Sequence, residues 1–472
     1  MSGIRTILEV IAMTDNDSHI APLRRGIDTR RLTMIGLGGV IGAGLFVGSG
    51  KAIASGGPAV VLVYLATGLV VIGVMRMLAE LSTAHPETGS FAGYASRELG
   101  PWAGLAVGWV YSYHWCMTVA FEAVAGAAIA SNLAPGIPNW LYALIFLSAL
   151  TAVNLTAVSR FAHLEYWLAI IKVAAVVVFI GIGIAAICGA FPHFPTPGLS
   201  NLRGHNGFIP HGVMPLLITS LTVFFSYFGT EMVTVAAGET QDPVRSIRRS
   251  MRSLSARVLV FYVGSILIIV TVLPWNATQV TQSPYTAVLS RLGIPAAATI
   301  MNVVVLTAVL SCLNSGIYSS SRMLFALAQS GQAPRRLART TVRGVPATAV
   351  LIAASVGFAA VVANYFLSTT TVFTFLLGSS GALAVVVYLC ICLTHIAGRR
   401  RQSPEQIAAL PVRMWGAPYL PWAIVAVLVT IVIAMAVTPG NRNPLLLSST
   451  VTLIAIGAGL RFGRSREPQC SF

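Results

Sequence analysis

The feature that most constrains the fold is an apolar stretch, residues 32–54, that is long enough to cross a bilayer yet is rich in glycine. Seven glycines lie between Gly36 and Gly50, and each weakens a helix interior by roughly 1 kcal/mol relative to alanine. A lipid-facing helix cannot contain such a break, because freed backbone groups find no water in hydrocarbon. Close packing of helices through small residues explains one pair of glycines better than it explains seven. We therefore expect a broken helix whose break lines a protein-enclosed cavity.

A second irregular segment supports the same interpretation. Residues 224–231 place polar groups, Gly229 and Glu231 in the middle of another apolar stretch. Discontinuous helices that bind a small solute near the bilayer midplane are typical of secondary transporters, and the free amides at such a break can hold an anion such as a carboxylate. The two broken segments are the first and sixth predicted spans, which is where two inverted five-helix repeats would place them.

The composition indicates a polytopic membrane protein. Of 472 residues, 56% are hydrophobic and 9% are charged, and the mean hydropathy is +0.80, whereas soluble domains contain roughly 25% charged residues. We predict an all-α membrane protein with twelve spans, ten in the inverted-repeat core and two accessory. The predicted spans are residues 32–54, 58–80, 102–130, 138–158, 162–190, 212–237, 256–275, 296–321, 346–366, 370–396, 417–438 and 444–462.

The net charge of +16 reflects topology and not a surface for nucleic acid. Arginines gather in alternate connections, for example within residues 245–257 and 399–413, and the positive-inside rule then places both termini in the cytoplasm of a cell-membrane protein. The predicted divisions are a cytoplasmic tail (1–31), the first repeat (32–190), an extracellular connection (191–211), the second repeat (212–396), the accessory helices (417–462) and a second cytoplasmic tail (463–472).

Three ionisable side chains lie deep in the predicted spans: Glu122, Lys172 and Glu231. A charge at a helix centre costs about 2.5–3.5 kcal/mol on insertion scales, so each is a candidate functional residue, and all three are candidates for proton coupling. Lys172 is one of only two lysines, and we predict that it exchanges a proton during transport instead of snorkelling to the interface. Glu122 could receive a substrate ammonium, pair with another helix or face an extracellular vestibule. Glu231 fits a local cap and a functional role equally well.

Other classes of protein lack support in the sequence. There is no phosphate-binding loop, no nucleophile paired with a base and no spacing of metal ligands. We therefore expect neither ATP-driven transport nor an enzyme, and we expect no cofactor and no metal.

Motifs spread over residues 24–462 carry a resemblance to a known family. They are Ile41–Gly50, Met75–Leu81 with Pro86–Phe91, Gly108–Tyr111, Glu165–Val173, Phe228–Glu231 with Ala237–Glu239, and Ser311–Gly316 with Ser321–Leu324. In this order and spacing they resemble the amino-acid permeases of the amino acid–polyamine–organocation superfamily. Within it the chain is most similar to the 4-aminobutyrate (GABA) permeases, which also have alanine at the position of Ala43 and resemble residues 121–123 and 135–140.

The resemblance implies a 5+5 inverted-repeat fold and proton-coupled transport of a small zwitterionic amino acid. The substrate carboxylate would lie on the amides of the first break and the ammonium near the second. The substrate-binding residues implied are Ile41, Gly42, Ala43, Gly44, Glu122, Phe228, Gly229 and Thr230. Lys172 matches the position where proton-coupled relatives place a lysine. The expected partners are an amino acid, protons and the lipid bilayer. Basic or neutral amino acids such as arginine or asparagine, and a transporter-fold sensor, remain alternatives.

Overall fold

The computed structural model describes residues 27–85, 89–192, 194–204, 206–367, 369–438 and 442–462. Within these ranges the chain is helical apart from turns, loops and one isolated parallel bridge between Ile27 and Thr240. The prediction of an all-α chain is therefore confirmed. Most of the predicted N-terminal tail (residues 1–26), the motif at residues 86–88 and the predicted tail 463–472 lie outside the described residues.

Helices occupy each segment that we predicted to span the membrane. The first segment is divided into α2 (Thr29–Val40), a π-helical turn η1 (Gly44–Gly48) and α3 (Ser49–Gly56). The sixth is divided into α10 (Val213–Tyr227) and α11 (Met232–Ala236). The other long helices are α4 (Val60–Ala84), α6 (Pro101–Leu133), α7 (Asn139–Asn154), α8 (Val158–Ile187), α12 (Pro243–Val272), α15 (Pro295–Gln329), α16 (Ala347–Phe366), α17 (Thr369–Arg401), α19 (Tyr419–Val437) and α20 (Arg442–Phe462).

Short helices lie in the connections between these long ones. They are η2 (Gly57–Ala59), α5 (Ser90–Glu98), α9 (Ser200–Arg203), η3 (Ala237–Glu239), α13 (Thr278–Gln282), α14 (Pro284–Arg291), η4 (Arg335–Ala338) and α18 (Pro404–Ala409).

The helices make this a multi-pass membrane protein. Among the described residues, nine helical stretches are long and apolar enough to cross a membrane. The first of them, Thr29–Ala84, takes in two predicted spans, whereas α7 and the apolar part of α12, Arg257–Val272, are shorter than the rest. The count of twelve spans and the inverted repeat stay predictions.

Two helices extend well beyond their predicted spans. α12 begins at Pro243, ahead of residue 256, and α15 continues to Gln329, past residue 321. Asp242 caps α12 by accepting a hydrogen bond from the backbone N–H of Arg245 (3.1 Å), and Pro243 suits the first turn because it has no N–H to satisfy. Hydropathy detects the apolar part of such a helix and misses its polar turns.

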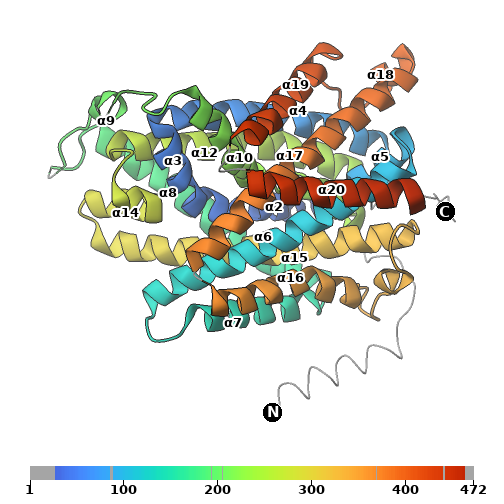
Figure 1. Ribbon diagram of the computed structural model, residues 1–472, viewed down its shortest axis with the longest axis horizontal. Helices are drawn as coiled ribbons and strands as arrows, with labels where there is room; N and C mark the ends of the chain where they lie inside the picture. Colours follow the sequence, from blue (N-terminus) through green and yellow to red (C-terminus); the bar gives the residue numbers. More distant parts are fainter. Residues whose placement is uncertain are drawn as a thin grey trace.

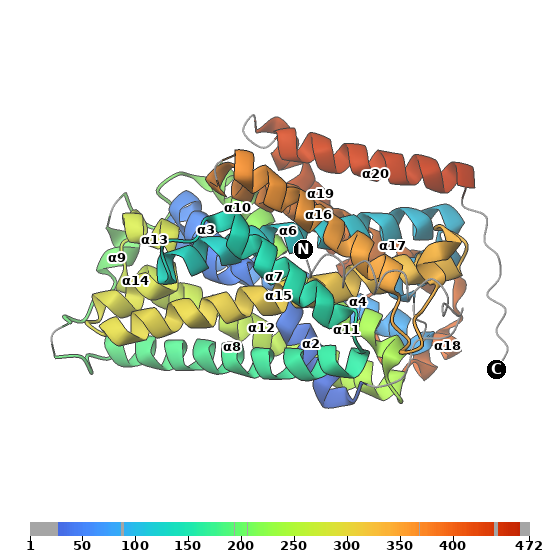
Figure 2. The ribbon, with the colours of Figure 1, turned by 90° about the horizontal axis from the view of Figure 1, so that it is seen from below.

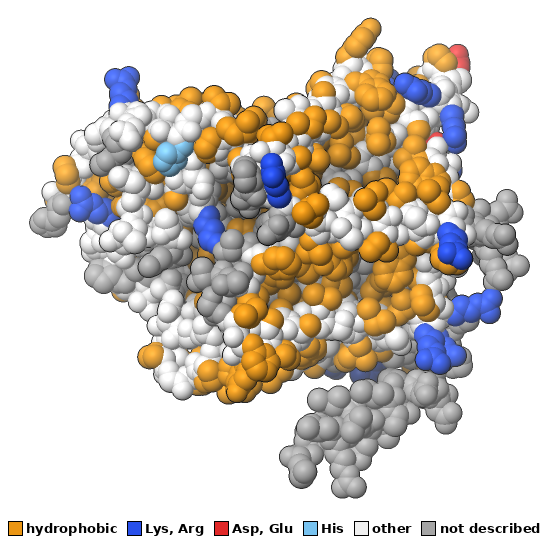
Figure 3. Space-filling view, in the orientation of Figure 1, with side chains coloured by type: hydrophobic (Ala, Val, Ile, Leu, Met, Phe, Trp, Pro, Cys, Tyr) orange, Lys and Arg blue, Asp and Glu red, His pale blue; other side chains and the backbone are white. Residues whose placement is uncertain are grey.

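The arrangement of the bundle separates core helices from lipid-facing ones. α6 and α15 lie side by side through the middle (Figure 1, Figure 2). In the most apolar 18-residue stretch of α6, 72% of the residues are buried, against 28% in α8 and 17% in α20. α8 and α20 accordingly lie at opposite edges of the bundle in Figure 2. Figure 3 shows hydrophobic side chains over much of the surface between the two ends, as contact with lipid requires.

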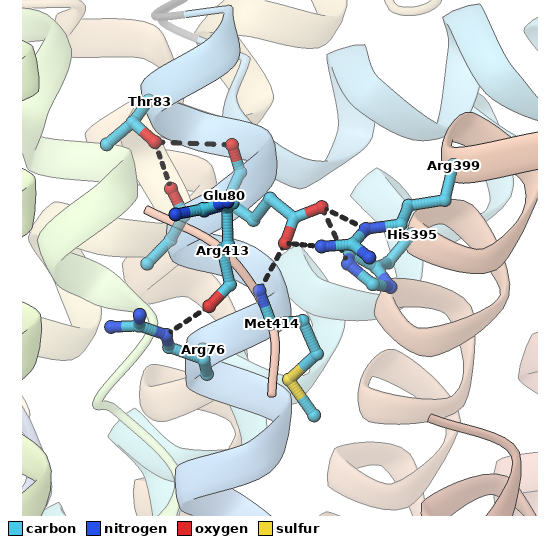
Figure 4. A network of polar contacts seen from close by, with 8 residues as sticks. Arg76, Glu80, Thr83, His395, Arg399, Arg413 and Met414 are labelled. Atoms are coloured by element: carbon cyan, nitrogen blue, oxygen red, sulfur yellow. Dashed lines mark hydrogen bonds and ion pairs between the residues drawn. The ribbon is translucent and has the colours of Figure 1, made fainter. Parts of the chain in front are cut away.

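At the end of the bundle that we predict to face the cytoplasm, Glu80 joins three separate segments (Figure 4). Its carboxylate, on α4, accepts two hydrogen bonds from Arg399 of α17, at 2.7 and 2.9 Å, and lies 3.1 Å from Nε2 of His395. It also accepts the backbone N–H of Met414, in the loop that leads to α19. Arg76 donates to the carbonyl of Arg413 (2.8 Å) in the same loop. Glu80 thus fixes α17 and the loop that leads to α19 to α4.

We expect Glu80→Gln to destabilise the protein by about 3 kcal/mol, because removing one partner leaves the other charge of a largely buried pair uncompensated. Thermal unfolding in detergent measures the effect. Glu98→Gln is the matched control, because Glu98 pairs with the exposed Arg97 and Arg401 and such pairs contribute at most about 1 kcal/mol. Equal melting temperatures for the two variants would show that Glu80 does not hold these segments together.

Candidate functional site at the two helix breaks

The break in the first span lies between α2 and η1, within the glycine-rich stretch. α2 ends at Val40, and Ile41 has an extended backbone (φ −84°, ψ 93°). The helix resumes at Ala43, and the N–H groups of Leu45 and Phe46 donate to the carbonyl of Gly42. The break therefore exposes the positive end of a half-helix inside the protein, with the N–H of Ala43 outside the helical ladder.

The Glu122 carboxylate occupies that half-helix end. Both of its oxygens lie 3.1 Å from the backbone nitrogen of Ala43 and accept its hydrogen bond. Glu122 comes from the middle of α6, and only 1% of it is exposed. A Cβ at position 42 would lie 2.5 Å from Glu122 Oε1, so the carboxylate reaches the amide only because residue 42 is glycine. The structure thus shows an internal carboxyl group on the amide.

The carbonyls at the end of α2 are satisfied by side chains from other helices. Such carbonyls have no partner within their own helix and need one elsewhere. Lys172 Nζ, from α8, donates to the carbonyls of Gly38 (2.6 Å) and Ile41 (3.0 Å). Two further donors complete the set: Cys312 Sγ on the carbonyl of Gly39 (3.3 Å) and the Tyr262 hydroxyl on the carbonyl of Val40 (2.8 Å).

The break in the sixth span packs directly against the first. α10 ends at Tyr227, Phe228 is extended (φ −67°, ψ 143°) and Gly229 has a positive φ of 115°. A Cβ on Gly229 would lie 2.6 Å from the carbonyl oxygen of Gly39, so both the backbone angle and the close approach require glycine. Glu231 Oε2 accepts the N–H of Gly229 (2.9 Å), which is a local bond within the break, and its side chain does not cap α11.

A small pocket lies between the breaks. Residues that line it include Gly44, Trp115, Glu122, Phe228 and Cys312. Its volume is about 10 Å³, which leaves room for about one water molecule. This conformation is therefore closed around the site, and an amino acid enters only when the lining side chains move apart.

The structure brings most of the predicted site residues together. Gly44, Glu122 and Phe228 line the pocket, with Gly42 and Ala43 next to Glu122. The other predicted residues adjoin the pocket without lining it. Ile41 lies at the end of α2, where Lys172 of α8 donates to its carbonyl. Gly229, Thr230 and Glu231 follow Phe228 in the second break.

Sequence reasoning did not single out Glu165, which lies two turns before Lys172 on α8. The buried Glu165 carboxylate accepts hydrogen bonds from Ser311 Oγ and from Asn314 Nδ2 (3.1 Å). A Cβ on Gly38 would overlap Glu165 Oε1, so Glu165 and Lys172 both lie against Gly38. The spacing of seven residues, which places two side chains on one helix face, was the available signal.

We expect Gly42→Ala to lower the melting temperature of the protein in detergent, because the new methyl group would overlap the Glu122 carboxylate and Cys312, and such overpacking costs about 1–3 kcal/mol of stability. Gly48→Ala is the matched control from the same segment. Its Cβ would meet nothing closer than 3.6 Å, so the melting temperature should stay near that of the parent. A melting temperature of Gly42→Ala equal to that of the parent would refute the close approach at residue 42.

Comparisons with known proteins identify the family of the chain. Residues 31–460 match the model of the amino acid permease family. The chain is 45% identical to a gamma-aminobutyric acid permease of Bacillus subtilis, covering 94% of each protein, and 40% identical to a gamma-aminobutyric acid permease of Escherichia coli, covering 92% of each. A manganese transporter of Eremococcus coleocola shares the fold, with a TM-score of 0.60 and 14% identity over 92% of each chain. The chain belongs to the amino acid permease family.

Proposed function

We propose that the protein is a proton-coupled secondary transporter that imports 4-aminobutyrate by alternating access across the cell membrane. The names of its relatives support the substrate, at 40 to 45% identity over most of the chain. With this function we also propose twelve spans in an inverted repeat and both termini in the cytoplasm, as the distribution of arginine indicates.

The observation that carries this proposal is the contact between Glu122 and the amide of Ala43. An amino-acid substrate carries a carboxylate that requires the same kind of site, so the substrate and Glu122 compete for one N–H. A charged carboxylate accepts this bond more strongly than a protonated one. Protonation of Glu122 therefore releases the amide for the substrate, and this exchange couples proton binding to substrate binding.

Lys172 supplies the second link in the coupling. As an ammonium it holds α8 to the end of α2 through the carbonyls of Gly38 and Ile41. Loss of its proton leaves one lone pair and fewer donors on the nitrogen, which weakens this bridge and frees the first broken helix to move relative to α8. Glu231 is the third candidate for the proton, because its carboxylate is fully buried beside the second break.

The direct test is accumulation of radiolabelled GABA in proteoliposomes with an imposed proton gradient. We expect the parent protein to concentrate GABA when the gradient is present and to reach only equilibrium without it. Lys172→Gln should lose this accumulation and retain GABA exchange between the two sides. Lys51→Gln is the control, since Lys51 is the other lysine of the chain and lies outside the pocket.

Accumulation by Lys172→Gln equal to that of the parent would place the coupling elsewhere. A panel of competing amino acids in the same assay tests the substrate. If arginine or asparagine displaces labelled GABA far better than unlabelled GABA does, the protein is an amino-acid transporter with a different substrate.

A further inference from the structure

A polar cleft lies between the start of α2 and the start of α12, at the end of the bundle that we predict to face the cytoplasm. Its volume is about 590 Å³. Most of the side chains that line it are polar or charged, and three are arginines: Arg30 from α2, and Arg245 and Arg249 from α12. The cleft shares no lining residue with the pocket between the breaks. It is therefore a separate candidate binding site.

The three arginines of the cleft are available to a ligand. Arg30, Arg245 and Arg249 are exposed, and within the described residues their side chains form no hydrogen bond and no ion pair. A guanidinium group presents several N–H donors in one plane, and this arrangement matches the oxygen atoms of a carboxylate or a phosphate. Three such groups from two helices can surround a single anion.

The two aspartates that also line the cleft, Asp28 and Asp242, are engaged at the ends of their own helices. Asp28 accepts the backbone N–H of Arg31 (2.7 Å) and lies 3.8 Å from Nε of the same arginine. Asp242 accepts the backbone N–H of Arg245 (3.1 Å). Each aspartate thus caps its helix. The three arginines outnumber the two aspartates, so the cleft favours an anion.

The depth of the cleft in the membrane indicates where the anion comes from. We expect the helix breaks near the bilayer midplane, and Arg30 precedes the end of α2 at Val40 by ten residues. With a rise of 1.5 Å per residue, Arg30 lies about 15 Å from the break. This distance is about half the thickness of the hydrocarbon core, so Arg30 reaches the level of the lipid headgroups.

α12 meets α2 at the same depth. The hydroxyl groups of Thr29 and Ser246 lie 2.8 Å apart. One turn further into the bundle, the hydroxyl groups of Thr33 and Ser250 are also separated by 2.8 Å. The cleft therefore opens directly beside the contact between α12 and the first half of the broken helix. An anion held by arginines of both helices would add an ionic bridge to these hydroxyl pairs.

We propose that Arg30, Arg245 and Arg249 bind the phosphate group of an anionic phospholipid, which bridges α2 and α12. Basic pockets between membrane helices on the cytoplasmic side are suited to such headgroups. A free phosphate ion offers the same oxygen atoms, but only a lipid is concentrated at this depth. Phosphatidylcholine is a weaker ligand, because the arginines repel its quaternary ammonium.

The test is thermal unfolding of the purified protein in a neutral detergent, titrated with short-chain phosphatidylglycerol. A ligand that binds only the folded protein raises its melting temperature. We expect phosphatidylglycerol to raise the melting temperature to a plateau, and phosphatidylcholine and inorganic phosphate to leave it nearly unchanged at equal ionic strength. The concentration of lipid that gives half of the rise measures the affinity.

A triple variant, Arg30→Gln with Arg245→Gln and Arg249→Gln, removes the positive charge of the site. Its affinity for phosphatidylglycerol should fall at least about tenfold, because each arginine beside an anionic headgroup contributes roughly fivefold. The matched control changes Arg335, Arg336 and Arg339 to Gln. These three exposed arginines lie in and next to η4, outside the cleft, and the control should keep the affinity of the parent.

Equal losses of affinity in the two triple variants would show attraction to total charge and would overturn the site. So would a parent protein that neither phosphatidylglycerol nor inorganic phosphate stabilises. Stabilisation by inorganic phosphate as strong as that by the lipid would support the phosphate site and assign it to a soluble phosphate. If the first triple variant does not fold, Arg249→Gln alone must still lower the affinity roughly fivefold, with Arg336→Gln as its control.

Discussion

The rest of the site depends on one constraint, which is that a helix broken inside a membrane protein must have every freed backbone group satisfied. At the first break the amide of Ala43 is satisfied by Glu122, and the carbonyls from Gly38 to Ile41 are satisfied by side chains of α8, α12 and α15. Each of these donors and acceptors lies on a different helix from the break. The break is therefore held open by the surrounding bundle, and any change in one partner alters the balance at the others.

In the closed pocket, the group that satisfies the amide of Ala43 belongs to the protein itself. Under the proposed function, Glu122 lies in the place that a substrate carboxylate would take, and in this conformation its carboxyl group accepts the hydrogen bond of the amide. The Tyr262 hydroxyl also lies 2.6 Å from the carbonyl of Ser226, and a single hydroxyl thus links the ends of both α2 and α10. Under the proposed alternating access, this bond would couple movement at the two breaks.

The positions of the breaks could be predicted from the sequence, whereas most of their partners could not. Glycine density located the first break, and Gly229 beside a carboxylate located the second, because these are local properties of the chain. The hydrogen bond from Gly229 to Glu231 is local as well. Glu122 was identified as deep and ionisable, but its contact with Ala43 joins residues 79 positions apart. Glu80 and Arg399 are 319 positions apart, and no periodicity in one sequence reveals such a pair.

Proton uptake on substrate binding tests the central claim most directly. Titration calorimetry of GABA binding, repeated in buffers with different ionisation enthalpies, measures the number of protons taken up for each GABA bound. If the substrate carboxylate displaces Glu122 from the amide of Ala43 and Glu122 takes a proton, binding to the parent protein must be accompanied by net proton uptake. This uptake must disappear in Glu122→Gln. Binding of GABA to the parent with no proton uptake, or with the same uptake in Glu122→Gln, would contradict the account.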